Sequence, residues 1–167
     1  MIKLNMWIVP VSALIPLIVG FIWYNPKVFG ASWMKAAGVS EDKMKGGNMG
    51  LAFFLSYLFS CFLAFMLVGI TIHQMGFQSV LMNEDGFGVE GSEISKFFHD
   101  FMGKYGNNFR TFKHGALHGT MAGIFIAFPI LATNALFERK GWKYIWINAG
   151  YWIVSMMLMG GVICQFA

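Results

Sequence analysis

The sequence predicts an all-α integral membrane protein, a bundle of four transmembrane helices with an amphipathic interfacial helix in the long second connection. Hydrophobic residues make up 57% of the chain and charged residues only 12%, about half the charged share of a soluble domain. Four apolar stretches are each long enough to cross a bilayer core of about 30 Å. The 20 glycines would weaken soluble helices but are common in membrane helices. We expect residues 1–167 to form one membrane domain.

The first span is predicted at about residues 6–24. Pro10 and Pro16 interrupt it, which membrane helices tolerate when neighbouring groups satisfy the freed carbonyls. Asn25-Pro26 is expected to end this helix, because the residue before proline disfavours the α region. A secretory signal peptide is the alternative. Its basic region would consist of Lys3 alone and its apolar stretch is long, so we expect a retained span.

The second span is predicted at about residues 48–72, after a connection that carries four lysines. Within that connection, Ser40-Glu41-Asp42 resembles the cap and acidic first turn of a short helix. The span itself is dense in phenylalanine, leucine and methionine, and it ends at His73-Gln74.

The second connection, residues 73–113, is too long to be expected without structure of its own. After Ser92, apolar residues recur every three or four positions through Tyr105, and charged residues fall between them. This pattern predicts an amphipathic helix at about 92–105, too short and polar to span, lying in the membrane interface or folding over the bundle. Residues 77–90 are compatible with either a short hairpin or a loop.

The third and fourth spans are predicted at about residues 114–136 and 143–166. The third contains about 22 residues without an acidic or basic residue, from Gly115 to Leu136. Only a short charged turn, residues 138–141, separates the two spans. The two helices are therefore expected to be antiparallel neighbours.

Basic residues near the spans predict the orientation. The first and third connections together carry seven lysines and arginines, against five at the opposite side. Because cytoplasmic loops are enriched in basic residues, we expect both termini and the long second connection outside. The expected location is the plasma (inner) membrane of a bacterium. The net charge of +4 is spread beside the spans, as expected for lipid headgroup contacts, and does not indicate a nucleic-acid partner.

Small and amide residues within the spans predict helix packing. Gly115, Gly119 and Gly123 recur on one helix face, where they allow another helix to approach closely, either within the bundle or between protomers. Alternatively, they leave room for a lipid or ligand beside His118. Asn134 and Asn148 require partners in apolar surroundings, so we expect them to hydrogen-bond across the hairpin of the last two spans.

The four histidines are expected to gather at one side of the membrane. His114 and His118 lie one helical turn apart and face the same way, which allows both to ligate one divalent metal ion such as zinc. His99 and His73 are the candidates for further ligands. The alternative is interfacial histidines that hydrogen-bond to backbone carbonyls or headgroups.

Other chemistry is not indicated by the sequence. It contains no phosphate-binding loop, no Cys-x-x-Cys pair and no Gly-x-Ser-x-Gly elbow, so we predict no catalytic or organic-cofactor residues. No acidic residue lies within a span, which counts against proton-coupled transport. Cys61 and Cys164 are expected at different depths and therefore as free thiols.

Two stretches carry a family resemblance. Residues 21–34 (FIWYNPKVFGASWM) and 134–152 (NALFERKGWKYIWINAGYW) resemble a family of small, mostly bacterial membrane proteins known as domain of unknown function 1761. The resemblance covers essentially the whole chain and implies four spans. The second connection is longer here than in simpler members. The family has no established activity to transfer.

The leading functional hypothesis is a non-enzymatic protein that acts by assembly, as a homo-oligomer or an accessory subunit of another membrane complex. The glycine stripe and the lack of catalytic motifs favour it. The first alternative is a metal site at the outer membrane face that binds or acts on a lipid or small molecule. The second is a small channel or transporter formed at an oligomer axis.

Overall fold

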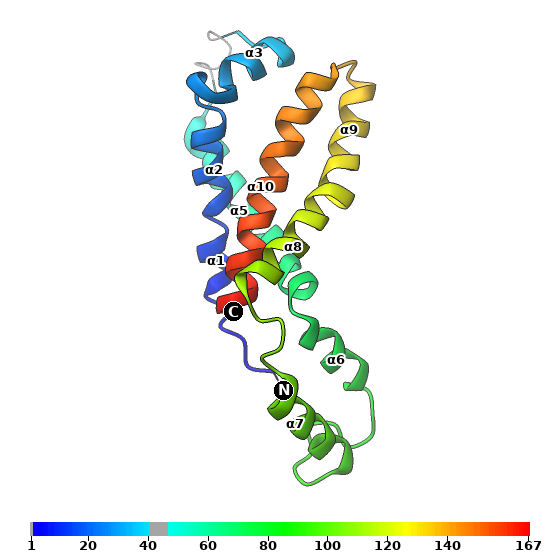
Figure 1. Cartoon of the computed structure of the whole chain (residues 1–167). Helices are drawn as coiled ribbons and strands as arrows, with labels where there is room; N and C mark the ends of the chain where they lie inside the picture. The colour runs from blue at the N-terminus through cyan, green and yellow to red at the C-terminus, as the bar shows by residue number, and fades with distance from the viewer. Residues whose placement is uncertain (1, 41–46) are drawn as a thin grey trace.

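The computed structural model describes residues 2–40 and 47–167, and this part of the chain is helical with no strand. The predicted all-α class is confirmed. Figure 1 shows a bundle of long helices with a smaller helical lobe beyond one end, the end at which both termini lie. The short helix predicted from Glu41 falls outside the described residues. In chain order the elements are α1 (Ile8–Ser12), α2 (Ile15–Trp23), the π-helix η1 (Pro26–Gly30), α3 (Ala31–Ala37), α5 (Met49–Thr71), α6 (His73–Leu81), α7 (Glu93–Tyr105), α8 (Phe112–Ala122), the π-helix η2 (Gly123–Ala127), α9 (Phe128–Phe137) and α10 (Trp142–Phe166).

Three helices are long and apolar enough to cross a membrane: Met49–Thr71, Phe112–Phe137 and Trp142–Phe166. Each agrees with a predicted span to within two residues. A fourth span is available if the bent pair Ile8–Trp23 and Pro26–Ala37, which meet at 55°, is counted as one. The structure therefore supports three to four spans by length and composition.

The predicted first span is broken into α1 and α2, and aromatic side chains from other helices bond to carbonyls at both prolines. The Tyr57 hydroxyl on α5 donates to the carbonyl of Pro10 at 3.2 Å. The Tyr151 hydroxyl on α10 donates to the carbonyl of Pro16 at 3.0 Å. These two bonds tie the irregular first span to α5 and α10.

Asn25-Pro26 ends α2, as predicted, but it also starts another helix. The Asn25 side chain accepts a hydrogen bond from the backbone N–H of Lys27 at 2.9 Å, and proline follows at the first helical position, where its missing N–H is not needed. The helical stretch of η1 and α3 then ends at Gly38, whose φ of 71° is left-handed. The sequence predicts only a polar connection for this stretch.

The third span changes from α-helix to π-helix and back. The π segment η2 lies directly before Pro129, which is in the first turn of α9. Proline has no N–H to donate to the carbonyl four residues earlier, and its ring clashes with that carbonyl. The wider turn of a π-helix relieves this clash. The predicted continuous span is thus one helix of three parts.

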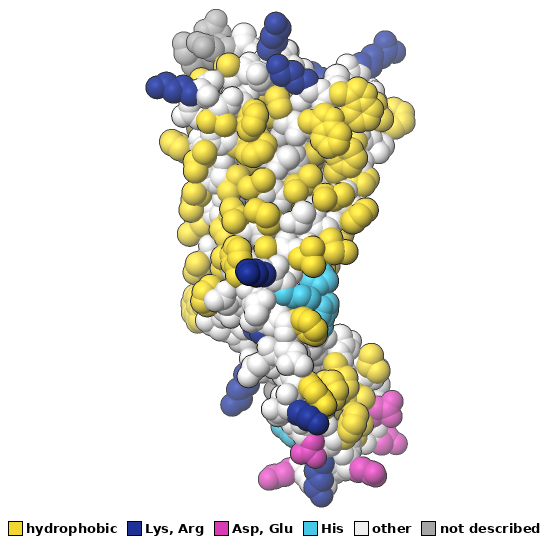
Figure 2. Space-filling view, in the orientation of Figure 1, with side chains coloured by type: hydrophobic (Ala, Val, Ile, Leu, Met, Phe, Trp, Pro, Cys, Tyr) yellow, Lys and Arg dark blue, Asp and Glu magenta, His cyan; other side chains and the backbone are white. Residues whose placement is uncertain are grey.

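The core lies around α10, which Figure 1 shows between the other long helices. Half of the residues in the apolar stretch of α10 are buried inside the chain, compared with 22% in each of the other two long spans. Leu67 of α5, Ala122 of α8 and Met159 of α10 belong to its main cluster of buried side chains. Figure 2 shows a broad apolar band across the visible face of the bundle. Phenylalanines of α5 such as Phe54 and Phe62 are about three-fifths exposed.

The lobe consists of α6, α7 and the turns between them, residues 73–105. Helix α7 confirms the helix predicted at about 92–105, whereas α6 was not predicted. Between them Gly86, Gly88 and Gly91 take positive φ values of 82–84°, and no strand forms, so the hairpin alternative for 77–90 is wrong. The Phe77 ring stacks on α7, 4.1 Å from the Phe101 ring centroid. Figure 1 shows the lobe extending away from the bundle; its expected place at a membrane interface stays a prediction.

Candidate metal centre

The position of α8 is set by an unusually close contact with α10. A Cβ atom added at Gly115 would collide with the carbonyl oxygen of Gly160, and one added at Gly119 with the carbonyl oxygen of Met156. A Cβ at Gly123 would lie 2.7 Å from the Cα of Ile153. The obstacles are backbone atoms, so only glycine permits this approach of the two helices.

Gly160 belongs to the same contact and was missed in the sequence. A Cβ there would lie 3.1 Å from the Cα of Gly119, so glycines face each other across the two helices. The signal was present as the adjacent pair Gly160-Gly161 within an apolar span. We call this contact of α8 and η2 with α10 the glycine seam.

The seam determines which way the histidines point. His114 and His118 each precede a seam glycine by one residue, and successive residues on an α-helix are rotated by about 100°. With Gly115 and Gly119 buried against α10, both imidazoles therefore project to the side of α8. The start of α8 is fixed by Thr111, whose side chain accepts a hydrogen bond from the His114 backbone N–H at 3.3 Å.

His73 reaches the same place from another helix. Helix α5 ends at Thr71, Ile72 is extended, and His73 is the first residue of α6. The next residue fixes the direction of α6, because the Gln74 side-chain amide donates to the carbonyls of Gly106 (3.0 Å) and Asn108 (2.8 Å). This role of Gln74 in fixing α6 was also missed, and a glutamine directly after an apolar span was its only signal in the sequence.

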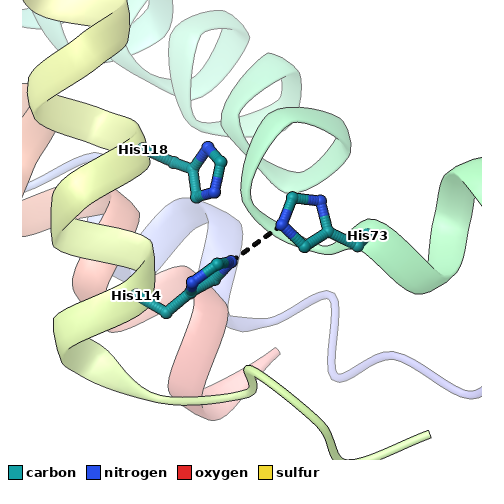
Figure 3. A group of neighbouring side chains, drawn as sticks. All are labelled: His73, His114 and His118. Atoms are coloured by element: carbon teal, nitrogen blue, oxygen red, sulfur yellow. Dashed lines mark hydrogen bonds between the residues drawn. The ribbon is translucent and has the colours of Figure 1, made fainter. Parts of the chain in front are cut away.

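The three imidazoles of His73, His114 and His118 converge, as Figure 3 shows. Their ring centroids lie 4.8, 4.8 and 4.5 Å apart, nearly an equilateral triangle. One nitrogen from each ring lies within 4.8 Å of the other two. Figure 2 places the histidines at the edge of the apolar band, next to the lobe. We call this group the histidine triad.

Two of these rings are hydrogen-bonded to each other. The Nε2 atoms of His73 and His114 lie 2.8 Å apart, so one nitrogen donates a proton and the other accepts it. An accepting imidazole is necessarily neutral, and protonating several rings at this spacing would bring like charges together. At least one imidazole of the triad is therefore neutral, the form in which histidine binds metals.

The spacing fits a tetrahedral metal ion. Zinc binds imidazole nitrogen at about 2.0–2.1 Å, which places two ligand nitrogens roughly 3.3 Å apart. The triad nitrogens lie between 2.8 Å and 4.8 Å from one another. Shifts of less than about 1 Å per nitrogen reach the metal geometry, within the range of small side-chain rotations.

The fourth histidine is not brought to this group. His99 lies on α7 in the lobe, with its ring 5.8 Å from that of Phe98, and it lines surface hollows with Lys96 and Asp100 or with Arg110. The sequence reasoning placed it near the triad by supposing that the loop folds back over the bundle, whereas the lobe extends away from it (Figure 1).

Comparison with known proteins identifies the family. A family model described as protein of unknown function (DUF1761) matches residues 7–164. The chain belongs to this family. The resemblance read from the sequence is confirmed, and the matched region includes the glycine seam and the histidine triad. No curated protein and no solved structure matches the chain.

In this DUF1761 chain an aromatic residue in an unusual conformation lies beside the triad. Phe109 has a φ of 61°, a left-handed value that bulky residues adopt at a cost of about 1–3 kcal/mol. Its ring is 65% exposed and lies 5.0 Å from the His114 ring and 6.3 Å from the His73 ring, by centroids. No sequence pattern indicated this placement.

The two amides within the spans have different surroundings from those expected. Asn148 accepts a hydrogen bond from the Tyr24 hydroxyl at 2.9 Å and donates to the Tyr144 carbonyl of its own helix at 2.8 Å. It therefore ties α10 to the end of the first span rather than to α9. Asn134 is exposed on α9 and shares with Asn148 a small hollow between the two helices.

Both cysteines are free, as predicted. Cys164 is buried on α10 beside the seam, and its Sγ lies 3.3 Å from the Phe109 carbonyl and 3.4 Å from that of Thr71. These contacts join the end of α10 to the two segments that flank the triad. Its thiol is directed at carbonyls and is not one of the converging ligands.

Proposed function

We propose that this protein is a multi-pass membrane protein that binds one divalent transition-metal ion, of which zinc fits best, through His73, His114 and His118. The observation that carries the proposal is the convergence of three imidazoles from two helices, with His73 and His114 lying 41 residues apart in the chain. Imidazole is a preferred ligand of zinc, and three histidines are a complete protein ligand set for an open zinc site.

The proposed ion would keep a fourth coordination position for a water molecule or another oxygen ligand. Three-histidine zinc sites leave that position open, in contrast to structural sites with four protein ligands. The exposure of His73, compared with the half-buried His114 and His118, leaves the position accessible from the lobe side. We therefore propose a ligand-binding metal centre rather than a closed structural one.

The distribution of charge supports an orientation for the proposed membrane domain, residues 1–167. On the face shown in Figure 2, lysines and arginines stand at both ends of the apolar band, whereas the acidic residues lie on the lobe, so the end away from the lobe is the more basic one. Because basic residues favour the cytoplasmic side, we place the triad, the lobe and both termini at the outer face of a plasma membrane.

The glycine seam gives less support to the assembly hypothesis than the sequence alone suggested. Gly115, Gly119 and Gly123 face α10 of the same chain, so this stripe is already used within the protomer. A homo-oligomer, an accessory role and a channel at an oligomer axis stay predictions that would rest on other surfaces. The triad is the feature that favours a specific chemistry.

Zinc binding is expected at about one ion per chain near pH 7.5, with an affinity that falls as the pH is lowered. Each ligand imidazole must be unprotonated, and an ordinary histidine pKa is about 6.5. With at least one proton to displace at the lower pH, the affinity should drop by about tenfold or more between pH 7.5 and 5.5. Equilibrium dialysis of the detergent-solubilised protein followed by elemental analysis measures both quantities.

Calcium provides the matched comparison in that assay, because it prefers oxygen ligands and should not compete for imidazole. Fewer than about 0.2 tightly bound zinc ions per folded chain at pH 7.5 would contradict the proposed function, as would zinc affinity that is the same at both pH values.

A further inference from the structure

A groove lined by aromatic rings adjoins the histidine triad. Phe77 of α6, Phe101 and Tyr105 of α7 and Phe109 supply its aromatic lining, and His73 is one of its polar lining residues. Its volume is about 450 Å³, within the range of roughly 300–1,000 Å³ typical of small-molecule sites. His73 thus belongs both to the proposed metal site and to the groove.

We infer that this groove holds the hydrocarbon chain of a long-chain fatty acid whose carboxylate binds the open position of the metal. The inference rests on the proposed function, since the triad metal supplies the site for the carboxylate. It specifies the ligand class of that centre as a single-chain amphiphile with an anionic head.

Charge complementarity favours an anionic head. Three neutral imidazoles leave a zinc ion with its full positive charge, and carboxylate oxygen is a zinc ligand at about 2.0–2.2 Å. None of the residues that line the groove is acidic. The ammonium group of Lys104 lies 5.2 Å from the centre of the ring of Tyr105, which lines the groove.

The location of the groove favours a single hydrocarbon chain over a bilayer phospholipid. The adjoining spans end at Thr71 and begin at Phe112, and the groove residues lie between these positions in the chain, outside the spans. An occupant must therefore leave the bilayer core. A fatty acid exchanges through water, whereas a phospholipid would have to withdraw two chains.

Phe109 connects the two parts of the inferred site. It lines the groove, and its ring centroid is 5.0 Å from that of His114. The carboxylate and the first methylenes of a bound fatty acid would pass this ring on the way from the metal to the groove. Contact with the bound fatty acid would explain why Phe109 is held exposed in a left-handed conformation.

The test uses the full chain in phosphatidylcholine nanodiscs with Co²⁺ in place of zinc, because cobalt bound to the triad gives a visible spectrum that responds to its fourth ligand. Acetate and dodecanoate are titrated separately, and free concentrations are measured by dialysis. Dodecanoate should shift the spectrum at a free concentration about 100-fold or more below that of acetate, since burial of its methylenes adds to the same carboxylate contact.

Variants show whether the groove produces this preference. Phe101→Ala should reduce the preference for dodecanoate by about tenfold and leave the response to acetate unchanged. Phe97→Ala is the matched control, because Phe97 is on the same helix, is 53% exposed and is not a lining residue. Phe109→Gly removes a second lining ring, and glycine adopts the left-handed backbone of residue 109 without strain. If Phe101→Ala does not fold, the dodecanoate preference of Phe109→Gly tests the groove instead.

The outcomes separate the two proposals. If Co²⁺ gives no triad spectrum, the proposed function itself fails. If Co²⁺ binds but acetate and dodecanoate act at similar free concentrations, only the fatty-acid inference is overturned. It is also overturned if the preference survives in both groove variants, because partition of dodecanoate into the bilayer would then account for it.

Discussion

Replacing Gly119 with leucine is expected to cause the largest loss of stability of any single substitution in the glycine seam. Even a Cβ atom at this position meets the backbone of Met156 and Met157, which cannot move unless α8 and α10 separate. Overfilling a well-packed contact costs about 1–3 kcal/mol, and we expect a loss of roughly 3 kcal/mol for leucine. Thermal unfolding in detergent, followed by circular dichroism, measures it.

Gly69 is the matched control for this experiment. It lies within the long helix α5, and a Cβ added there would have no atom within 4 Å. Alanine is favoured over glycine in a helix by about 1 kcal/mol, so Gly69→Ala should raise the stability slightly while Gly119→Ala lowers it. Equal effects of the two alanine substitutions, or wild-type stability of Gly119→Leu, would show that the helices are not in close contact.

Alanine substitutions in the triad are expected to have the largest effect on metal binding. Loss of an outer-shell partner of a metal ligand costs about 10–100-fold in affinity, and loss of a direct ligand should cost more. We therefore expect His73→Ala, His114→Ala and His118→Ala each to weaken zinc binding by at least about 100-fold. Competition with a zinc-sensitive dye measures the change in folded, monodisperse protein.

His99→Ala is the matched control for the triad variants. This variant also loses an imidazole, but from a lobe helix on which His99 lies apart from the triad. Its zinc affinity should remain within about twofold of the wild type, a small change on the scale of ligand loss. Equal losses in His99→Ala and His118→Ala would mean that zinc binds non-specifically to histidines.

The long spans could be predicted because their positions depend on local composition. Uninterrupted apolar stretches, a short charged turn at residues 138–141 and the polar segment after Ile72 determine where α5, α8–α9 and α10 begin and end. The break within α8–α9, next to Pro129, could not be predicted in the same way. The π segment before Pro129 depends on how the neighbouring helix accepts the bend, which periodicity does not show.

The candidate site could be predicted only in part. The spacing of His114 and His118 places both on one face of a helix, and the end of a span places His73 at a similar depth. His99 was assigned wrongly to the neighbourhood of the triad because the path of a 41-residue connection is set by contacts such as the Gln74 bonds to Gly106 and Asn108. Those contacts have no signature in the pattern of hydrophobic residues.

X-ray absorption at the zinc edge of the loaded protein tests the metal centre most directly. The measurement counts ligand atoms and recognises imidazole by its multiple scattering. The proposed site predicts three imidazole nitrogens at about 2.0–2.1 Å and one further oxygen ligand, with one imidazole fewer in His118→Ala and no change in His99→Ala. A wild-type spectrum that fits at most one imidazole, or that contains a sulfur ligand at about 2.3 Å, would contradict it.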